Sequence, residues 1–186
     1  MKHFLLSTLV SVAFMACQPV EMKGKVENNV NFVFDEANEK FKRIAFKEEG
    51  DLRGLNIGTS SNNLLDRENF LILEDDFYKH YQIDLNSYEF FDLIYYKYDG
   101  KLDEITVDIH LESDLEALEI HDDFVNWLDS KYGKSVLDYN GDLVWNKNLN
   151  DSTVIAYNLK MVSSFPDADK AGLEKKIELG IITLAK

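Results

Sequence analysis

The chain has 186 residues, of which 34 are Asp or Glu and 20 are Lys or Arg, so its formal net charge at pH 7 is −14. A surface this acidic repels nucleic acid and anionic lipid head groups, because both are bound through basic side chains. The hydrophobic content of 45% is ample for a buried core and excludes disorder over the body of the chain. The charge would steer a basic partner towards the surface.

The first residues have the pattern of a bacterial export signal. Lys2 gives a short positive start, residues 4–16 form an apolar run, and the small residue Ala16 precedes Cys17. The run is shorter than the roughly 20 residues that a membrane-spanning helix needs. We therefore predict that residues 1–16 are a cleaved signal peptide. Its removal leaves 19 basic and 34 acidic residues, a net charge of −15.

Phe14-Met15-Ala16-Cys17 resembles the lipobox of bacterial lipoproteins, in which the cysteine is lipidated and becomes the first mature residue. Cys17 is the only cysteine, so an internal disulfide is impossible and acylation would use the single thiol. The resemblance implies a palmitate-type anchor on Cys17, and Gln18 after it implies an outer membrane lipoprotein that faces the periplasm. The alternative is an ordinary secretory signal with a chance cysteine.

The remainder divides into a tether and one domain. Residues 17–30 are polar and would join the lipid to the fold, whereas residues 31–186 contain no Pro/Gly/Ser-rich linker and are expected to form a single α+β globular domain. At its start, helical spacing of Phe41, Ile44 and Ala45 predicts a helix within residues 36–46.

The next segments predict strands. From residue 69 the apolar period changes to two, which predicts short strands at 70–73 and 77–83. Residues 89–98 and 102–111 flank Asp99-Gly100, a strong signal for a two-residue type I′ hairpin. In that register Ile94 lies opposite Ile105 and Phe90 opposite Ile109. The paired side chains would then form the buried face, with Thr106, Asp108 and His110 on the face towards water.

A second helix and three further strands follow. Ser113 with Glu116 three residues later is a capping-box pattern, and Gly133 marks the helix end after Tyr132. The expected apolar stripe contains Leu118, Phe124, Val125, Trp127, Leu128 and Tyr132. Residues 143–145, 153–161 and 176–184 are expected to be strands. This order predicts antiparallel sheet with helices packed on one face, and favours a helix-plus-meander unit used twice.

No set of residues predicts catalysis. The chain has no serine elbow and no phosphate-binding loop, and His80, His110 and His121 have no metal-ligand spacing. We therefore expect no cofactor and no catalytic residue. Asp167, Asp169 and Glu178 match three positions of a calcium loop, although Ala171 interrupts the pattern, so a polar loop between strands is the stronger interpretation.

Ile57-Gly58-Thr59-Ser60-Ser61-Asn62-Asn63-Leu64 is similar to the start of the first helix in outer-membrane lipoproteins of the SmpA/OmlA type. The β-lactamase-inhibitor-like relatives of that family repeat a helix-plus-strands unit. The resemblance implies a non-enzymatic role in contact with another protein.

These observations favour a membrane-anchored lipoprotein that binds another protein, with a basic protein as a candidate, and that binds no nucleic acid. It would be an envelope-assembly factor, an inhibitor or an immunity protein, with Phe91, Tyr95 and Trp127 as anchors if any lie on the surface. The alternatives are an envelope hydrolase with an unrecognised carboxylate site, and a passive ligand-binding or calcium-binding module.

We predict that Cys17→Ala abolishes lipid attachment and releases the protein from membranes or stalls it unprocessed, because the apolar run of the signal is too short to serve as an anchor. Cell fractionation after labelling with a fatty acid measures both effects. Lipid labelling and membrane retention that persist in the variant would contradict lipidation at Cys17.

Overall fold

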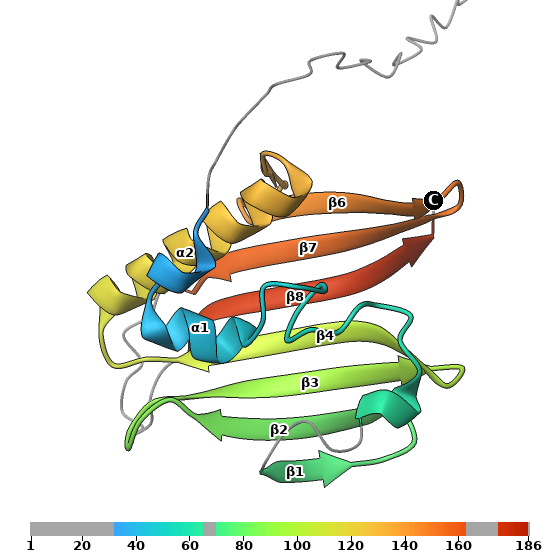
Figure 1. Ribbon diagram of the computed structural model, residues 1–186, viewed down its shortest axis with the longest axis horizontal. Coiled ribbons are helices and arrows are strands. Elements are labelled where there is room, and N and C mark those ends of the chain that lie inside the picture. The colour runs from blue at the N-terminus through green and yellow to red at the C-terminus, as the bar shows by residue number, and fades with distance from the viewer. Residues whose placement is uncertain (1–31, 65–69, 163–174, 186) are drawn as a thin grey trace, which may run out of the picture.

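The computed structural model describes residues 32–64, 70–162 and 175–185 (Figure 1). Its elements are, in order, η1 Phe34–Glu36, α1 Glu39–Ala45, η2 Ser61–Leu64, β1 Leu71–Glu74, β2 Tyr78–Asp84, β3 Phe90–Tyr98, β4 Lys101–His110, α2 Asp114–Tyr132, β5 Val136–Leu137, β6 Leu143–Asn150, β7 Thr153–Met161 and β8 Lys175–Ala185. The prediction of a mixed fold with antiparallel sheet is confirmed, and the sheet dominates it.

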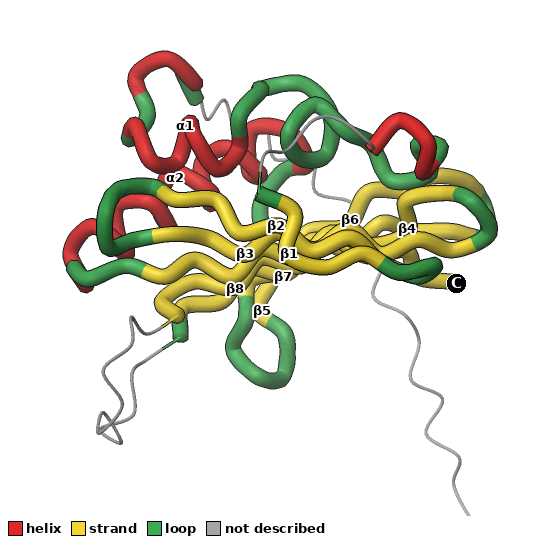
Figure 2. The backbone as a smooth tube through the Cα atoms, turned by 90° about the horizontal axis from the view of Figure 1, so that it is seen from below, coloured by secondary structure: helices red, strands yellow, loops and turns green. Residues whose placement is uncertain are grey.

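One sheet contains all eight strands, in the order β1-β2-β3-β4-β8-β7-β6-β5, and every pair is antiparallel. Along the chain, α1 comes before β1 to β4 and α2 comes before β5 to β8. Each helix is thus followed by four strands in sequence order, and the pairing of β4 with β8 joins the two groups. Figure 2 shows both helices on the same side of the sheet, and α2 contacts β6, β7 and β8.

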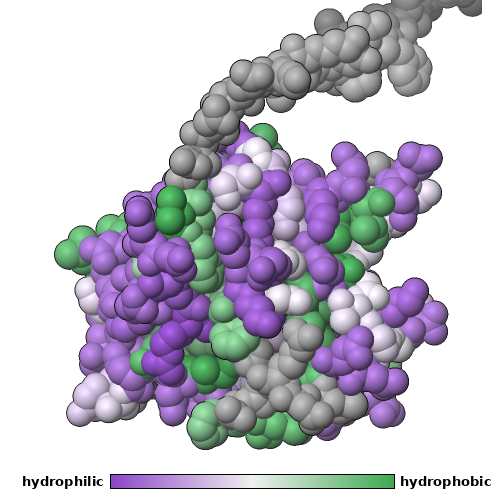
Figure 3. All heavy atoms as spheres, in the orientation of Figure 1, coloured by the Kyte–Doolittle hydropathy of each residue, from purple (hydrophilic) through white to green (hydrophobic). Residues whose placement is uncertain are grey.

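The hydrophobic core lies between the sheet and the helices. Alternate residues of the central strands point into it and are fully buried, as the period of two requires. They include Phe91, Leu93, Tyr95, Ile105, Val107, Ile109, Ile155, Tyr157, Leu159, Ile177, Leu179 and Ile181. From the helices, Phe41 of α1 packs edge-on against Phe124 of α2, with ring centroids 4.8 Å apart. The outside of the helix-bearing face is largely hydrophilic (Figure 3).

The hairpin between β3 and β4 has the predicted turn and a different register. Asp99 and Gly100 both have positive φ, 48° and 70°, as a type I′ turn requires. A bulge then shifts the pairing, because Lys97 lies opposite Leu102 but Tyr96 lies opposite Glu104. The predicted register was therefore wrong by one residue.

The shift exchanges the two faces of β3. Phe91 lies opposite Ile109, whereas Phe90 lies opposite His110. Phe90, Ile94 and Tyr96 accordingly point away from the core, and Phe91, Leu93 and Tyr95 fill it. A displacement of one residue has this effect because side chains alternate along a strand.

The second helix begins and ends where the sequence predicted. Ser113 is its N-cap, and the Oγ atom accepts a hydrogen bond from the backbone N–H of Glu116 at 3.3 Å. Gly133 ends the helix with φ of 84°. Leu118 was wrongly assigned to the buried stripe, since it is 51% exposed, and Ala117 and Ile120 are buried instead.

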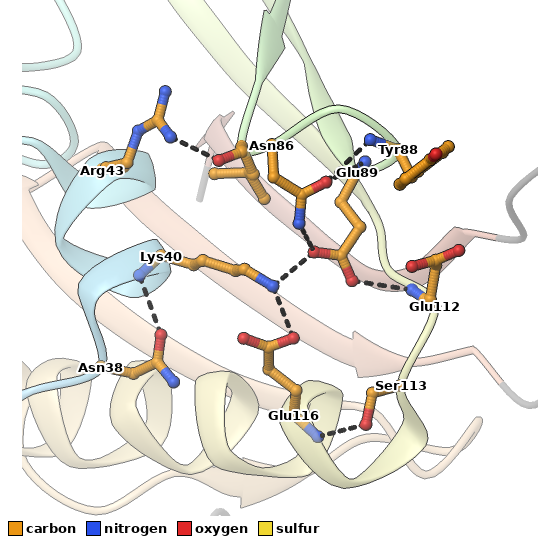
Figure 4. A network of polar contacts seen from close by, with 10 residues as sticks. Asn38, Lys40, Arg43, Asn86, Tyr88, Glu89, Glu112, Ser113 and Glu116 are labelled. Atoms are coloured by element: carbon orange, nitrogen blue, oxygen red, sulfur yellow. Dashed lines mark hydrogen bonds and ion pairs between the residues drawn. The ribbon is translucent and has the colours of Figure 1, made fainter.

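A network of polar contacts joins α1, the β2–β3 turn and the start of α2 (Figure 4). Lys40 forms ion pairs with the carboxylates of Glu89 and Glu116, and the backbone N–H of Glu112 donates to Glu89 Oε1 at 2.9 Å. Burial of Glu89 would raise its pKa, but the hydrogen bonds from Lys40 and the Glu112 backbone lower it below the ordinary value. A buried carboxylate with these donors fixes the helices to the sheet.

A second buried carboxylate, Asp51, holds the loop after α1. Its Oδ1 atom accepts hydrogen bonds from the Tyr157 hydroxyl at 2.7 Å and from Lys147 Nζ at 2.8 Å, and Oδ2 accepts one from the Ile57 backbone N–H at 2.8 Å. Burial opposes ionisation of Asp51, but these donors lower its pKa. The loop is thereby attached to β6 and β7.

Replacement of Gly100 by valine should lower the free energy of unfolding by about 1 kcal/mol or more, because a β-branched residue is strained at positive φ. A Cβ atom at Gly100 would meet nothing within 4 Å, so the loss would come from the backbone conformation alone. Thermal or urea denaturation measures the change. Gly100→Asn is the control, since asparagine tolerates this conformation. A valine variant as stable as the parent would contradict the turn assignment.

Candidate functional site

The sheet has a second face, turned away from the helices, and among the described residues no helix lies on it (Figure 2). We call it the open face. Thr106, Asp108 and His110 of β4 are half-buried there, as the sequence predicted. A sheet face without covering helices is expected to be either simply solvated or a binding surface.

The centre of the open face is hollowed. A depression of about 410 Å³ lies over β4, β8 and β7. It is lined by Glu104, Thr106, Asp108, Asp142, Asn158, Lys160, Glu178, Leu179, Gly180 and Ile182. We call it the Gly180 depression, because Gly180 lies in register with Thr106 on one side and with Asn158 on the other. The lining has four carboxylates and a single ammonium group.

Carboxylates also occupy neighbouring strands at the same level. Asp92 of β3 lies opposite Asp108 of β4, and Asp108 lies opposite Glu178 of β8. We call these three residues the acidic row. Like charges directly opposite each other destabilise an antiparallel pair unless neighbouring groups compensate them.

Two histidines flank one end of the acidic row. His80 Nε2 lies 2.8 Å from Asp92 Oδ1, and His110 Nε2 lies 3.3 Å from Asp92 Oδ2. The His110 ring stacks on Phe90 with centroids 4.4 Å apart. At the other end, Lys160 lies opposite Glu178. Asp108, in the middle, has acids as both of its register partners.

Glu104 lines the depression, and its pKa shifts in the opposite direction to the pKa values of the buried acids Glu89 and Asp51. Burial raises its pKa, the Thr106 hydroxyl lowers it by donating a hydrogen bond at 3.3 Å, and the neighbouring Asp103 raises it again. The net shift is upward. Its charged form is therefore less favourable in the folded protein than in water.

The turn that contributes Asp142 to the depression also holds exposed apolar side chains. The turn that follows β5 is fixed by Asp138, whose Oδ1 atom accepts hydrogen bonds from the backbone N–H groups of Asn140 at 2.7 Å and Asp142 at 3.0 Å. This turn holds Tyr139, which is 95% exposed, and Val136 before it is 53% exposed. Figure 2 shows a loop beside β5 that projects on the side away from the helices. Exposed aromatic groups on ordered turns are suited to protein contact.

The sequence-predicted site residues have different outcomes. Cys17, Asp167 and Asp169 lie outside the described residues, as do the predicted signal peptide and the whole predicted tether. Glu178 belongs to β8 and lines the depression. Among residues 32–64, 70–162 and 175–185, no three His, Cys, Asp or Glu residues are grouped to hold a metal ion. Phe91, Tyr95 and Trp127 were suggested as anchors on the condition that they lie on the surface, and this condition is not met, because all three are fully buried in the core.

Sequence reasoning missed the depression because its lining comes from residues 104–108, 142, 158–160 and 178–182. Only the strand order and register bring these segments together. One local signal was available, since Gly180 interrupts the apolar strand Ile177 to Leu184. Glycine inside a strand often marks a place where a ligand or another backbone approaches closely.

No protein-family model, curated protein or solved structure matches this chain. In the described ranges, none of the helices combines the length and apolar character needed to cross a membrane. The function is therefore inferred from the residues and geometry given above.

We predict that Glu104→Gln raises the melting temperature at pH 7. The folded-state pKa of Glu104 is above its ordinary value of 4.5, so ionisation destabilises the fold as pH rises through that interval. The neutral glutamine avoids this loss and retains an acceptor for Thr106. The difference between variant and parent should disappear at about pH 4 and below, where Glu104 is largely protonated in both states.

Calorimetry across this pH range tests the prediction, with exposed Glu36→Gln as the control. A stabilisation by Glu104→Gln that is independent of pH would show that charge is not its cause.

Proposed function

We propose that the protein is a cell-envelope lipoprotein, attached to a membrane by lipid on Cys17, whose domain acts by binding another protein through the open face. The supporting observations are the acidic lining of the Gly180 depression and the exposed Tyr139, which belongs to the same turn as the lining residue Asp142. Together they offer a charged recess and an aromatic anchor on one surface, the combination that protein interfaces use for specificity and affinity.

Charge identifies the kind of partner. The net charge of the chain is −14, and the depression has four acidic groups against Lys160. A partner with a basic surface would be attracted over a distance of about 8 Å at physiological ionic strength. The same negative charge repels the phosphate groups of nucleic acid. Assembly factor, inhibitor and immunity protein are all roles compatible with such binding.

A hydrolase is the second candidate, because Glu104 has a raised pKa beside other carboxylates in the depression. A raised pKa favours the protonated form of a carboxyl group, which is the form that a general acid needs. Catalysis also requires a second carboxylate at a defined distance across a bound substrate. Turnover of envelope material by the purified protein, lost in Glu104→Gln, would favour this candidate over stoichiometric binding.

The test of the proposal is capture from envelope extract at two salt concentrations, followed by titration of the purified partner. We expect saturation at a fixed molar ratio and an association rate that falls as salt rises. Tyr139→Ala should weaken binding about ten-fold or more, as loss of an interface anchor does. Tyr88→Ala, an exposed tyrosine in the β2–β3 turn (Figure 4), is the matched control.

Substoichiometric conversion of a substrate, or equal losses in the two tyrosine variants, would contradict binding through the open face.

A further inference from the structure

The edge strand β1 lacks most of the features that protect a sheet edge. Among the described strands it pairs with β2 alone, and Figure 1 shows it at the end of the sheet. Phe70, Leu71, Ile72, Leu73 and, in the turn after the strand, Phe77 are 48–71% exposed. Edge strands are usually protected by charged residues, proline or a bulge, because open backbone groups and apolar side chains invite pairing with another chain. Residues 70–73 contain no charge and no proline, and β1 has only a bulge between Leu71 and Leu73.

Apolar side chains project on both faces of this edge. Leu71 is in register with the buried Tyr81 on the core side of the sheet, and Leu73 is in register with His80 on the open face. Together with the two phenyl rings they form an exposed apolar patch of a few hundred Å², the size at which such patches mark an interaction site. Figure 3 shows hydrophobic residues along the lower edge of the molecule, where Figure 1 places β1.

The backbone of Phe70 is strained at the start of this strand. Its φ of 82° lies in the left-handed region, which is a genuine exception for a bulky side chain. The carbonyl of Phe70 accepts a hydrogen bond from the Gln82 backbone N–H at 3.3 Å, but its ring is largely exposed. Packing within the chain therefore does not compensate the strain. Strained backbone is concentrated where a protein makes functional contacts, so Phe70 indicates that this edge contacts another molecule.

The opposite edge of the sheet is protected. There β5 is only two residues long, and the part of β6 beyond it exposes Asn146, Asn148 and Asn150. A very short edge strand and polar side chains discourage pairing. Of the two described edges, β1 is therefore the one suited to association. Pairing of two identical edges about a two-fold axis closes after two copies, whereas two different edges would extend into a fibre.

Charge favours a second copy of this chain as the occupant. Residues 70–73 offer no carboxylate that would attract a basic partner, and they match an uncharged apolar strand, which the chain itself supplies. Glu74-Asp75-Asp76 follow at one end. In an antiparallel pair centred on Ile72, the two Glu74 side chains are four residues apart along the strand, about 13 Å. This exceeds the screening length of about 8 Å at physiological ionic strength, whereas a parallel pair would place these acids side by side.

From these features we infer that β1 pairs antiparallel with β1 of a second copy, about a two-fold axis at Ile72, and forms a homodimer. The dimer goes beyond the binding proposed for the open face and does not depend on it. Because the bulge disrupts the backbone ladder, apolar contact contributes most of the stability. The patch is smaller than the interface of a tight complex, so the dimer is weak and depends on protein concentration.

Cysteine crosslinking tests the register. Directly opposite residues of antiparallel strands have Cα atoms about 4.5–5.5 Å apart, within the span of a disulfide. In cells that produce the full chain, a mild thiol oxidant should join Ile72→Cys to a second copy. Leu71→Cys and Leu73→Cys should give little product alone and a clear product when differently tagged chains are produced together. The parent chain measures any background from Cys17, and Leu149→Cys on β6, with the same exposure as Leu73, is the matched control.

Several outcomes would overturn the dimer. One is an Ile72→Cys product no stronger than that of Leu149→Cys, and another is an equal product from each single variant of residues 71–73. A crosslinked product whose mass identifies a different protein would make a foreign strand the occupant. A fluorophore attached to the thiol of Ile72→Cys, quenched by spin-labelled lipid in phosphatidylethanolamine–phosphatidylglycerol vesicles, would assign the edge to the membrane instead.

A lysine on the axis tests association without a covalent bond. Ile72→Lys places like charges opposite each other and should weaken association at least ten-fold, with the melting temperature unchanged because the side chain is exposed. Leu149→Lys should have no effect. Energy transfer between full chains with donor and acceptor fluorophores on C-terminal tags measures association. It should increase as salt rises, since salt screens the repulsion between copies with a net charge of −14 each.

Equal weakening by Ile72→Lys and Leu149→Lys, or association that falls as salt rises, would contradict the pairing of β1. Capture of a partner through the open face should persist in Ile72→Lys. Loss of the dimer with capture intact therefore overturns only this inference, and loss of capture with the dimer intact overturns only the proposed function.

Discussion

The pairing of β4 with β8 is the constraint on which the rest of the structure depends. Among the described strands, it is the one pairing between those that follow α1 and those that follow α2. On its core side it aligns Ile105 with Ile181 and Val107 with Leu179. Full burial of each such side chain stabilises the fold by about 1.5–3 kcal/mol. On its other side the same pairing aligns Asp108 with Glu178. Cross-strand side-chain pairs contribute only about 0.2–1 kcal/mol each, so burial of the apolar face decides this pairing.

Carboxylates have two opposite roles in this molecule. Glu89 and Asp51 are buried and receive hydrogen bonds from several donors, so their pKa values fall below the ordinary range although burial opposes this. Glu104 on the open face has its pKa raised by burial, with a single hydroxyl donor against that effect. The first kind attaches the helices and the loop after α1 to the sheet. The second kind leaves negative charge that a cationic partner would satisfy. Residue type alone does not distinguish these roles; the number of donors around each carboxylate does.

The sequence predicted the parts of the fold that depend on neighbours along the chain. The cap at Ser113, the glycine end at Gly133 and the Asp99-Gly100 turn are each decided by a few consecutive residues. The register of β3 and β4 was wrong because the bulge near Lys97 has no local signature, and one residue is enough to exchange the faces. The depression could not be predicted either, because it also has no local signature and exists only once β8 lies between β4 and β7. Gly180 was the exception, because a glycine inside an apolar strand can be recognised from the sequence.

Basic side chains lie beside both ends of the acidic row. Asp92 has two imidazoles within 3.3 Å, and Glu178 has Lys160 as its register partner. Asp108 lies between these two acids in the register. Gly180 lies two residues along β8 from Glu178, the register partner of Asp108, and a Cβ atom there would meet nothing within 4 Å. The acidic row and the open space at Gly180 therefore lie at the seam between the two halves, and a partner residue that reached this place would contact both halves at once.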